Sequence, residues 1–271
     1  MRGYPRNWLI DRTESHVPVV TRTTRSRGHR ISFEDAGSGR AIVLIPGWTM
    51  SAADWWDAGY IEHFAARHRV LAVDPLGNGL SDKPHEPDAY RFPDVAIDVV
   101  AAMDAAEVDQ AVVWGYSRGA SVAVSMAASR PDRVSGLVLV GSGNLSADIE
   151  PGTTPDPVFE AMCRGDFSPL WDEYQFSDAD RRYDAEFNDP IALGAMAIAD
   201  SRFGVRFGLD RISVPALLFV GEADAPDGDR ETAEVLGVAC HVLAGLDHLE
   251  EFSRTDLAFP LVDQFLAEHE L

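Results

Sequence analysis

The sequence is poor in basic residues, and lysine is almost absent from it. Lys83 is its one lysine, and 23 basic side chains face 44 acidic ones, which leaves a formal net charge of −21. A chain of this charge repels nucleic acid and anionic lipid surfaces, so neither is an expected partner. The composition is typical of coding in a GC-rich genome, and a solubility role explains the acidic surface.

Cysteine is also scarce, and long apolar runs are missing. Cys163 and Cys240 form no spaced motif, which indicates a reduced, cytoplasmic protein; one disulfide between them is the alternative. Charged residues interrupt the first 18 positions, and no apolar run is long enough to cross a bilayer, so we expect neither a signal peptide nor a membrane span. The expected partner is a small-molecule substrate, and the expected state is a monomer or a homodimer.

Short apolar runs alternate with helical patterns along most of the chain. This alternation predicts the α/β class, with a mostly parallel, doubly wound sheet and helices on both faces. The expected strands are residues 17–24, 29–35, 41–45, 69–73, the run that ends at Trp114, 134–140, 214–220 and 239–243. The expected helices are residues 54–67, 92–107, 118–129 and 255–268.

The alternation stops between residues 144 and 212. Prolines separate short amphipathic segments there, and about 70 residues is too long for a simple connection. We therefore expect an inserted helical cap at 144–212 over the carboxyl ends of the strands, with the core formed by 1–143 and 213–271. Large apolar side chains of this segment should form the cap's own core and, in part, line an apolar pocket: Phe159, Met162, Phe167, Trp171, Tyr174, Phe176, Met196, Phe203 and Phe207.

The motif Gly-x-Ser-x-Gly at residues 115–119 lies between an apolar, β-branched run and an Ala-rich helical run. A serine on a tight strand-to-helix turn has a strained backbone, and small residues are needed two positions before and after it. Gly115 and Gly119 occupy those positions. The motif predicts Ser117 as a nucleophile, with the amide of Arg118 at a helix start where it can donate to a developing oxyanion.

A serine hydroxyl needs a base, and the base needs an orienting acid. In a fold of this kind both follow the nucleophile, in the order acid and then histidine, on loops after later strands. Asp224 follows the expected strand at 214–220, and His248 lies on an expected loop between the last strand and the last helix. Asp227 and Asp229 are rival acids, but they lie farther beyond the strand.

Together these segments resemble the α/β-hydrolase fold superfamily, in particular its capped, serine esterase-like members. The resemblance extends from residue 29 to the C-terminus, and it rests on the segments 44–48, 74–81, 115–119, 221–224 and 247–248. It implies that Ser117 is the nucleophile, that His248 is the general base and acid, and that Asp224 fixes the imidazole tautomer. It also implies an oxyanion hole formed by the backbone amides of Trp48 and Arg118.

The chain departs from this family at two positions. Pro46 replaces a histidine that commonly precedes Gly47, so a hydrogen bond that often braces this loop is lost, whereas the Trp48 amide is retained. Asp247 stands where glycine often precedes the catalytic histidine. Its carboxylate either raises the pKa of His248 or faces solvent, and we favour solvent.

A serine at position 117 excludes the branches that use an aspartate nucleophile, which are haloalkane dehalogenases and epoxide hydrolases. The resemblance implies hydrolysis of a carboxylic ester or lactone of a small to medium apolar substrate through an acyl-enzyme, with the Trp48 side chain as a wall of the acyl pocket. The alternatives are a carbon–carbon bond hydrolase, lyase or acyltransferase on the same triad, or a ligand-binding protein without turnover. We expect no metal and no cofactor, because the other histidines lack paired spacing and Gly77-x-Gly79 lacks a third glycine.

Overall fold

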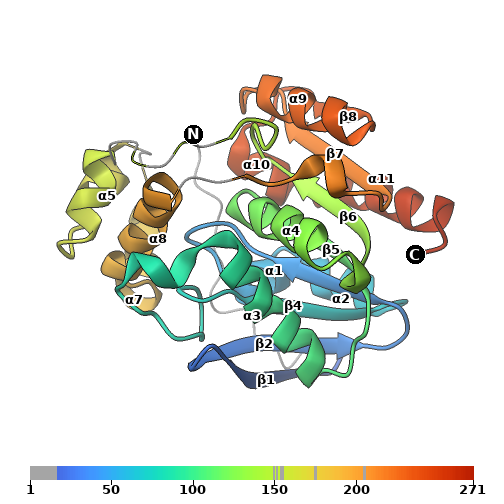
Figure 1. The fold of residues 1–271 in the computed structure, drawn as a ribbon, viewed down its shortest axis with the longest axis horizontal. Coiled ribbons are helices and arrows are strands. Elements are labelled where there is room, and N and C mark those ends of the chain that lie inside the picture. The colour runs from blue at the N-terminus through green and yellow to red at the C-terminus, as the bar shows by residue number, and fades with distance from the viewer. Residues whose placement is uncertain (1–16, 149, 151, 153–155, 174–175, 204–205) are drawn as a thin grey trace.

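The computed structural model describes residues 17–148, 150, 152, 156–173, 176–203 and 206–271 (Figure 1). The first 16 residues, and Tyr174 of the expected cap, lie outside this range. Both cysteines, Cys163 and Cys240, are free thiols. No described helix combines the length and the apolar character needed to cross a membrane.

Eight strands form one sheet, in the order β1-β2-β4-β3-β5-β6-β7-β8 (Figure 1). The strands are β1 (Val19–Ser26), β2 (His29–Gly37), β3 (Ala41–Ile45), β4 (Arg69–Asp74), β5 (Ala111–Tyr116), β6 (Val134–Val140), β7 (Ala216–Gly221) and β8 (Cys240–Leu243). β2 is antiparallel to β1 and β4, and all other neighbours pair in parallel. The predicted fold class and mostly parallel sheet are confirmed.

Helices cover both faces of this sheet because its central strands are apolar on both sides. The helices of the core are α1 (Ala52–Asp57), α2 (Tyr60–Ala65), α3 (Phe92–Ala105), α4 (Arg118–Ser129), α9 (Asp227–Leu236), α10 (His248–Ser253) and α11 (Thr255–Glu268). Successive residues of β5 point to opposite faces. Val113 packs in the core under α3 and α4, with Val99 and Ala123, whereas Trp114 packs in the core under α1 and α11, with Trp55.

Two local predictions are wrong. The helix expected at 54–67 is divided into α1 and α2, because Gly59 adopts a left-handed conformation (φ +84°) that an α-helix cannot continue through. His248, expected on a loop, is the first residue of α10. That helix has only six residues, which are too few to show a helical period in the sequence.

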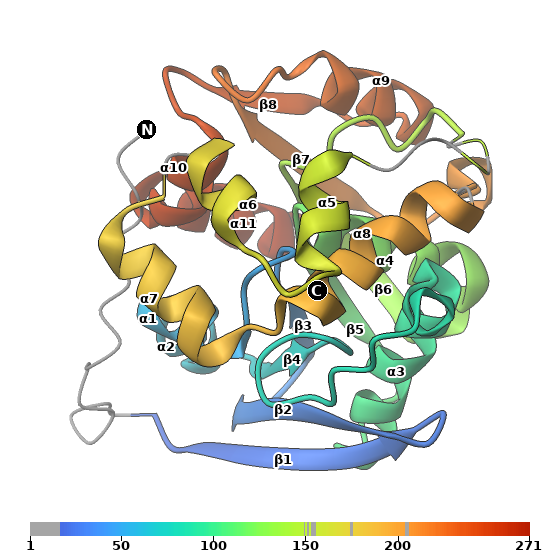
Figure 2. The ribbon, with the colours of Figure 1, turned by 90° about the vertical axis from the view of Figure 1, so that its left-hand side faces the viewer.

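Four further helices connect β6 to β7: α5 (Pro157–Met162), α6 (Ser168–Glu173), α7 (Asp178–Phe187) and α8 (Pro190–Phe203). We refer to α5–α8 as the inserted helices. They lie together on one side of the molecule, in front of the strands in the view of Figure 2. Met162 and Met196 are fully buried and share the core under α3 and α4. The inserted helices therefore pack on the core rather than standing apart from it.

Candidate active site

Ser117 lies on the sharp turn between β5 and α4, with φ +53° and ψ −123°. The packing around it shows why glycine flanks it. A Cβ on Gly115 would lie 2.2 Å from the carbonyl oxygen of Gly119, and a Cβ on Gly119 would lie 2.2 Å from that of Ile45. Any larger residue would push α4 away from β3 and β5, so these glycines are required by close backbone approach.

Ser117, His248 and Asp224 meet in space although they are far apart in the sequence. The Ser117 Oγ lies 3.0 Å from His248 Nε2, and His248 Nδ1 lies 2.7 Å from Asp224 Oδ2. The Tyr116 ring stacks on the imidazole with a centroid distance of 5.0 Å, and its hydroxyl donates to the His248 carbonyl at 2.5 Å. In this geometry Nδ1–H donates to the carboxylate, and Nε2 accepts from the serine hydroxyl when the imidazole is neutral.

A third acidic side chain, Glu251, belongs to this cluster and was not anticipated from the sequence. Its Oε1 lies 3.2 Å from His248 Nδ1, and its Oε2 accepts a 2.5 Å hydrogen bond from the Gly221 amide. The Glu251 side chain is fully buried, whereas that of Asp224 is 26% exposed. The sequence does contain a signal for this contact, because Glu251 is the third residue after His248. That spacing places two side chains on the same face only in a helix, and a helix was not expected here.

The two carboxylates change the proton affinity of the imidazole. Burial favours the neutral imidazole, but the hydrogen bonds and charges of Asp224 and Glu251 outweigh this effect and raise the pKa of His248 to about 10. Burial also raises the pKa of Glu251 to about 7, against the opposing effects of His248 and of the Gly221 amide. The proton on this cluster is therefore shared among coupled groups.

The other carboxylates near the triad have separate structural roles. Asp227 is exposed and pairs with Arg230, while Asp229 is buried and accepts from Ser142 and Gly143. Neither is the acid on His248. Asp247, which the sequence placed in solvent, is partly buried and caps α10 by accepting from the amides of its second and third residues. Asp247 therefore lies beside His248 because it is the N-cap residue of the helix that begins at His248.

The loop after β3, residues 46–51, carries one of the expected oxyanion donors, and we call it the oxyanion loop. Asn78 braces this loop where the family's histidine is missing. Its Nδ2 donates to the carbonyls of Trp48 and Met50, each at 2.7 Å, and lies 3.3 Å from that of Gly47. Within the described part of the chain, the amides of Trp48 and Arg118 donate to no protein acceptor. Both N–H groups therefore remain available.

A buried aspartate holds the far end of the oxyanion loop. Asp74, at the end of β4, accepts from the amide of Ala52 at 2.7 Å and from that of Leu80 at 2.9 Å. Burial raises its pKa to about 6. Its hydrogen bonds fix both the start of α1, which follows the oxyanion loop, and the turn that carries Asn78 to the end of β4.

The inserted helices contact the oxyanion loop directly. The Trp48 indole donates to the Leu193 carbonyl at 3.1 Å, and its ring lies edge-on against Phe159, 5.3 Å between centroids. Asn188 donates to the Thr49 carbonyl at 3.0 Å. α5, α8 and the α7–α8 connection therefore lie against the wall of the site.

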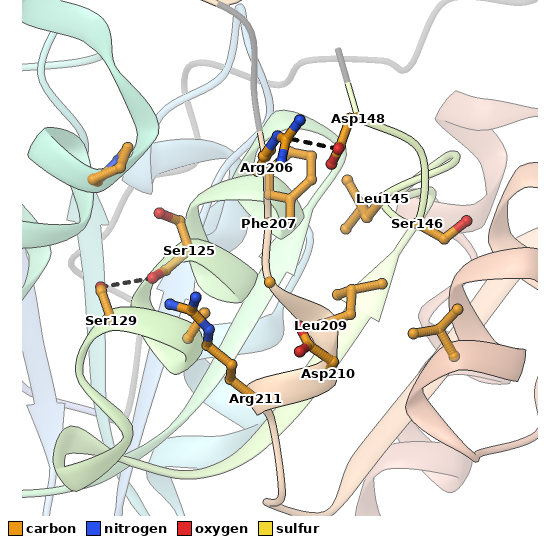
Figure 3. Close-up of a pocket in the computed structure, with 14 residues that line it drawn as sticks. Ser125, Ser129, Leu145, Ser146, Asp148, Arg206, Phe207, Leu209, Asp210 and Arg211 are labelled. Atoms are coloured by element: carbon orange, nitrogen blue, oxygen red, sulfur yellow. Dashed lines mark hydrogen bonds and ion pairs between the residues drawn. The ribbon is translucent and has the colours of Figure 1, made fainter. Parts of the chain in front are cut away.

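A separate cavity of about 560 Å³ opens farther along α4 (Figure 3). Ser125 and Ser129 line it, together with the ion pair of Asp148 and Arg206 at 3.1 Å (Figure 3). None of Ser117, Asp224 and His248 is among its lining residues, so this cavity is distinct from the triad.

The spacing of Asp224, His248 and Glu251 also resembles that of a metal site, since their donor atoms lie within 4.8 Å of one another. However, Nδ1 is hydrogen bonded to Asp224 and lies 3.2 Å from the Glu251 carboxylate, an arrangement in which a protonated Nδ1 donates to Asp224. The chemistry of this group is that of an acid–base cluster.

Comparisons with known proteins agree with the fold. A family model described as alpha/beta hydrolase fold matches residues 40–184. A 2-hydroxymuconate semialdehyde hydrolase from a Pseudomonas species is 34% identical over 153 residues, which cover 54% of this chain and 53% of that protein. A pimeloyl-(acyl-carrier protein) methyl ester esterase from Aeromonas hydrophila is 35% identical over 141 residues, covering 51% of this chain and 53% of the esterase.

These matches span about half the length of the curated relatives. A solved structure matches over a larger share of the chain. The enol-lactonase from Burkholderia xenovorans superimposes with a TM-score of 0.73 at 21% identity, covering 91% of this chain and 100% of that one. At this identity the likeness concerns the fold alone.

Proposed function

The chain belongs to the α/β-hydrolase fold family, and we propose that it is a serine hydrolase that cleaves a carboxylic ester or lactone of a small to medium apolar substrate through an acyl-enzyme. One observation carries the proposal. Ser117 Oγ, the His248 imidazole and Asp224 form a continuous hydrogen-bonded chain of 3.0 and 2.7 Å. These distances are within the range required for proton transfer between a nucleophile and its base.

In the proposed reaction, Ser117 Oγ attacks the carbonyl carbon while His248 Nε2 takes the hydroxyl proton. The Asp224 carboxylate keeps the Nδ1 proton in place and stabilises the imidazolium that forms. The amides of Trp48 and Arg118 donate to the oxyanion of the tetrahedral intermediate. The intermediate collapses when Nε2–H protonates the leaving alcohol, and water then releases the acid from Ser117 by the same steps.

We propose that residues 144–212 form a cap on a core made of 1–143 and 213–271. The contacts of Trp48 with Phe159 and Leu193 support this arrangement, because they place α5 and α8 beside the oxyanion loop. Apolar and aromatic groups on this side favour an apolar acyl or alcohol portion in a small-molecule substrate.

A second candidate reaction is hydrolysis of a carbon–carbon bond by the same triad. The similarity to a 2-hydroxymuconate semialdehyde hydrolase over half of the chain favours it. The two candidates differ in substrate preference. A carbon–carbon hydrolase turns over a vinylogous diketone far faster than p-nitrophenyl butyrate, and an esterase shows the opposite order.

The proposal is tested with p-nitrophenyl acetate and butyrate and with a fluorophosphonate probe mapped by mass spectrometry. We expect the probe on Ser117, and we expect Ser117→Ala to lower kcat by about 10⁴-fold or more, since the serine and its base act as a unit. Ser129→Ala, at the other end of α4, is the control and keeps wild-type kcat. A wild-type protein that is neither labelled nor active, yet binds a small ligand tightly, would show a binding protein without turnover.

A further inference from the structure

The acidic partner of the catalytic histidine in a triad is normally one carboxylate, but His248 faces two. Asp224 approaches Nδ1 from the loop after β7 at 2.7 Å, and Glu251 approaches it from α10 at 3.2 Å. The Nδ1 proton is directed to Asp224, whereas Glu251 Oε1 lies at ion-pair distance and has no hydrogen-bond partner in the described part of the chain. The imidazole therefore has a second, buried carboxylate on the side away from Ser117.

Glu251 is held rigidly in this position. Its other oxygen accepts from the Gly221 amide at the end of β7, and no part of its side chain is exposed. Gly141, at the end of β6, has a positive φ of +53°, and a Cβ there would lie 1.9 Å from Glu251 Oε1 and 2.9 Å from the imidazole. The ends of two strands thus leave a space that contains the Glu251 carboxylate and one edge of His248.

Burial of a carboxylate with a single backbone donor costs free energy, and an opposite charge or a further donor must offset that cost. Apart from Gly221, the group placed to do so is His248 Nδ1–H. The contact matters most when the imidazole is protonated, which is the state formed after Ser117 loses its proton. Glu251 is thus placed to stabilise the charged form that the reaction creates.

We propose that Glu251 is a positioning residue for His248: a second, buried carboxylate that holds the Nδ1 proton and takes over part of this task when Asp224 is lost. The proposal rests on the proposed function of His248 as the general base. Glu251 contacts neither Ser117 nor the position of the substrate carbonyl. It acts through the imidazole alone.

The groups that face this cluster come from several elements. Asp224 and Glu251 bind the imidazole, and Asp247 caps α10 beside it. Tyr116 from β5 stacks on the ring, and burial raises its pKa well above the ordinary value, so it stays neutral. Asp229 from α9 is bound by Ser142 and Gly143, and its charge acts at longer range. Glu251 is the group of this set that combines full burial with contact to Nδ1.

The first experiment measures the midpoint of His248 titration by ¹⁵N NMR of labelled histidine side chains, with the signal assigned by its loss in His248→Ala. Glu251→Gln should lower this midpoint by at least about one pH unit, because a neighbouring negative charge is removed. Glu250→Gln is the matched control, since it removes the same charge from the adjacent, exposed position, and it should leave the midpoint in place. An unchanged midpoint in Glu251→Gln and in Glu251→Met overturns the proposal.

The second experiment is a double-mutant cycle on the plateau value of kcat/KM. The single variant Asp224→Ala should retain a kcat/KM at least about tenfold higher than that of the double variant Asp224→Ala/Glu251→Gln. Glu251→Gln alone should lower kcat/KM by less than about tenfold. If the loss of kcat/KM in the double variant equals the product of the two single losses, Glu251 does not take over the task of Asp224. The titration midpoint does not depend on turnover. If the protein is inactive toward every ester, the proposed function is overturned, and the titration alone decides whether Glu251 acts on His248.

A third measurement covers the case in which the Glu251 variants do not fold. Asp224→Ala leaves Glu251 intact, and the ¹⁵N shifts of His248 report which ring nitrogen carries the proton. We expect the proton to remain on Nδ1. A mixture of tautomers in this variant would falsify the role assigned to Glu251.

Discussion

At the scale of single residues, the site depends on one strained backbone position and one crowded imidazole. Ser117 has a positive φ of +53°, which Gly115 and Gly119 make possible by allowing α4 to approach β3 and β5. His248 is held by Tyr116 on one face and by carboxylates at Nδ1. The proposed nucleophile and its proposed base are therefore positioned before any substrate arrives.

The pH dependence of the wild-type enzyme follows from the charge around His248. The base must be neutral to accept the Ser117 proton, and its pKa is raised above the ordinary value, to about 10. Activity should therefore be lost toward low pH, and kcat/KM should still rise as the pH increases from 7 to 9, by up to about tenfold per unit. Rates with p-nitrophenyl butyrate, corrected for spontaneous hydrolysis, measure this. A plateau already reached at pH 7 contradicts it.

At the scale of elements, the oxyanion loop is held from two sides. Asn78 and Asp74 bind it and the adjoining segment from the turn after β4, while Trp48 and Thr49 bind the inserted helices. The loop has one internal turn, in which the Met50 amide donates to the Gly47 carbonyl, and these contacts fix that turn and the Trp48 amide within it to the rest of the fold. The element that would stabilise the oxyanion is thus positioned by side chains from elsewhere in the fold.

Asn78→Ala should lower kcat on p-nitrophenyl butyrate by about 10- to 100-fold and change KM little, because the loop loses the donor to the Trp48 and Met50 carbonyls and the Trp48 amide shifts. The comparison is Asn144→Ala, an exposed asparagine outside this loop, which should retain wild-type kcat. A normal kcat in Asn78→Ala would mean that the loop holds its shape without the brace.

At the scale of the whole molecule, the excess of acidic side chains dominates the electrostatics. Several surface ion pairs form, such as Arg254 with Asp256 at 2.8 Å, but 44 acidic residues face only 23 basic ones. Exposed pairs contribute little individually, about 0–1 kcal/mol, whereas the uncompensated charges repel one another over the entire surface. Repulsion between acidic side chains should therefore determine how the stability of the fold responds to salt.

We expect the melting temperature to rise by a few degrees when NaCl is raised from about 20 mM to about 500 mM at neutral pH, because salt screens this repulsion. Calorimetry or fluorescence melts measure the change, and sucrose of matched osmolality controls for effects that do not depend on charge. A melting temperature that falls with salt would show that the ion pairs contribute more than the repulsion costs.

The sequence by itself determined the order of the strands, the helices α3, α4 and α11, the strained serine turn and the order of serine, aspartate and histidine, but it did not predict α9. These features depend on local rules: apolar periodicity, the size of glycine, and the loops that follow strands. The same rules misjudged residues 54–67, because Gly59 in a left-handed conformation ends a helix that the apolar spacing appeared to continue.

Only the tertiary structure decided which carboxylates surround His248 and what braces the oxyanion loop. Glu251 joins the imidazole because a short helix begins at His248, because Gly141 leaves room beside it and because the Gly221 amide binds its other oxygen. Asn78 reaches the carbonyls of the oxyanion loop because β3 and β4 are neighbours in the sheet. Such contacts join distant segments, and no local pattern in the chain specifies the distance between them.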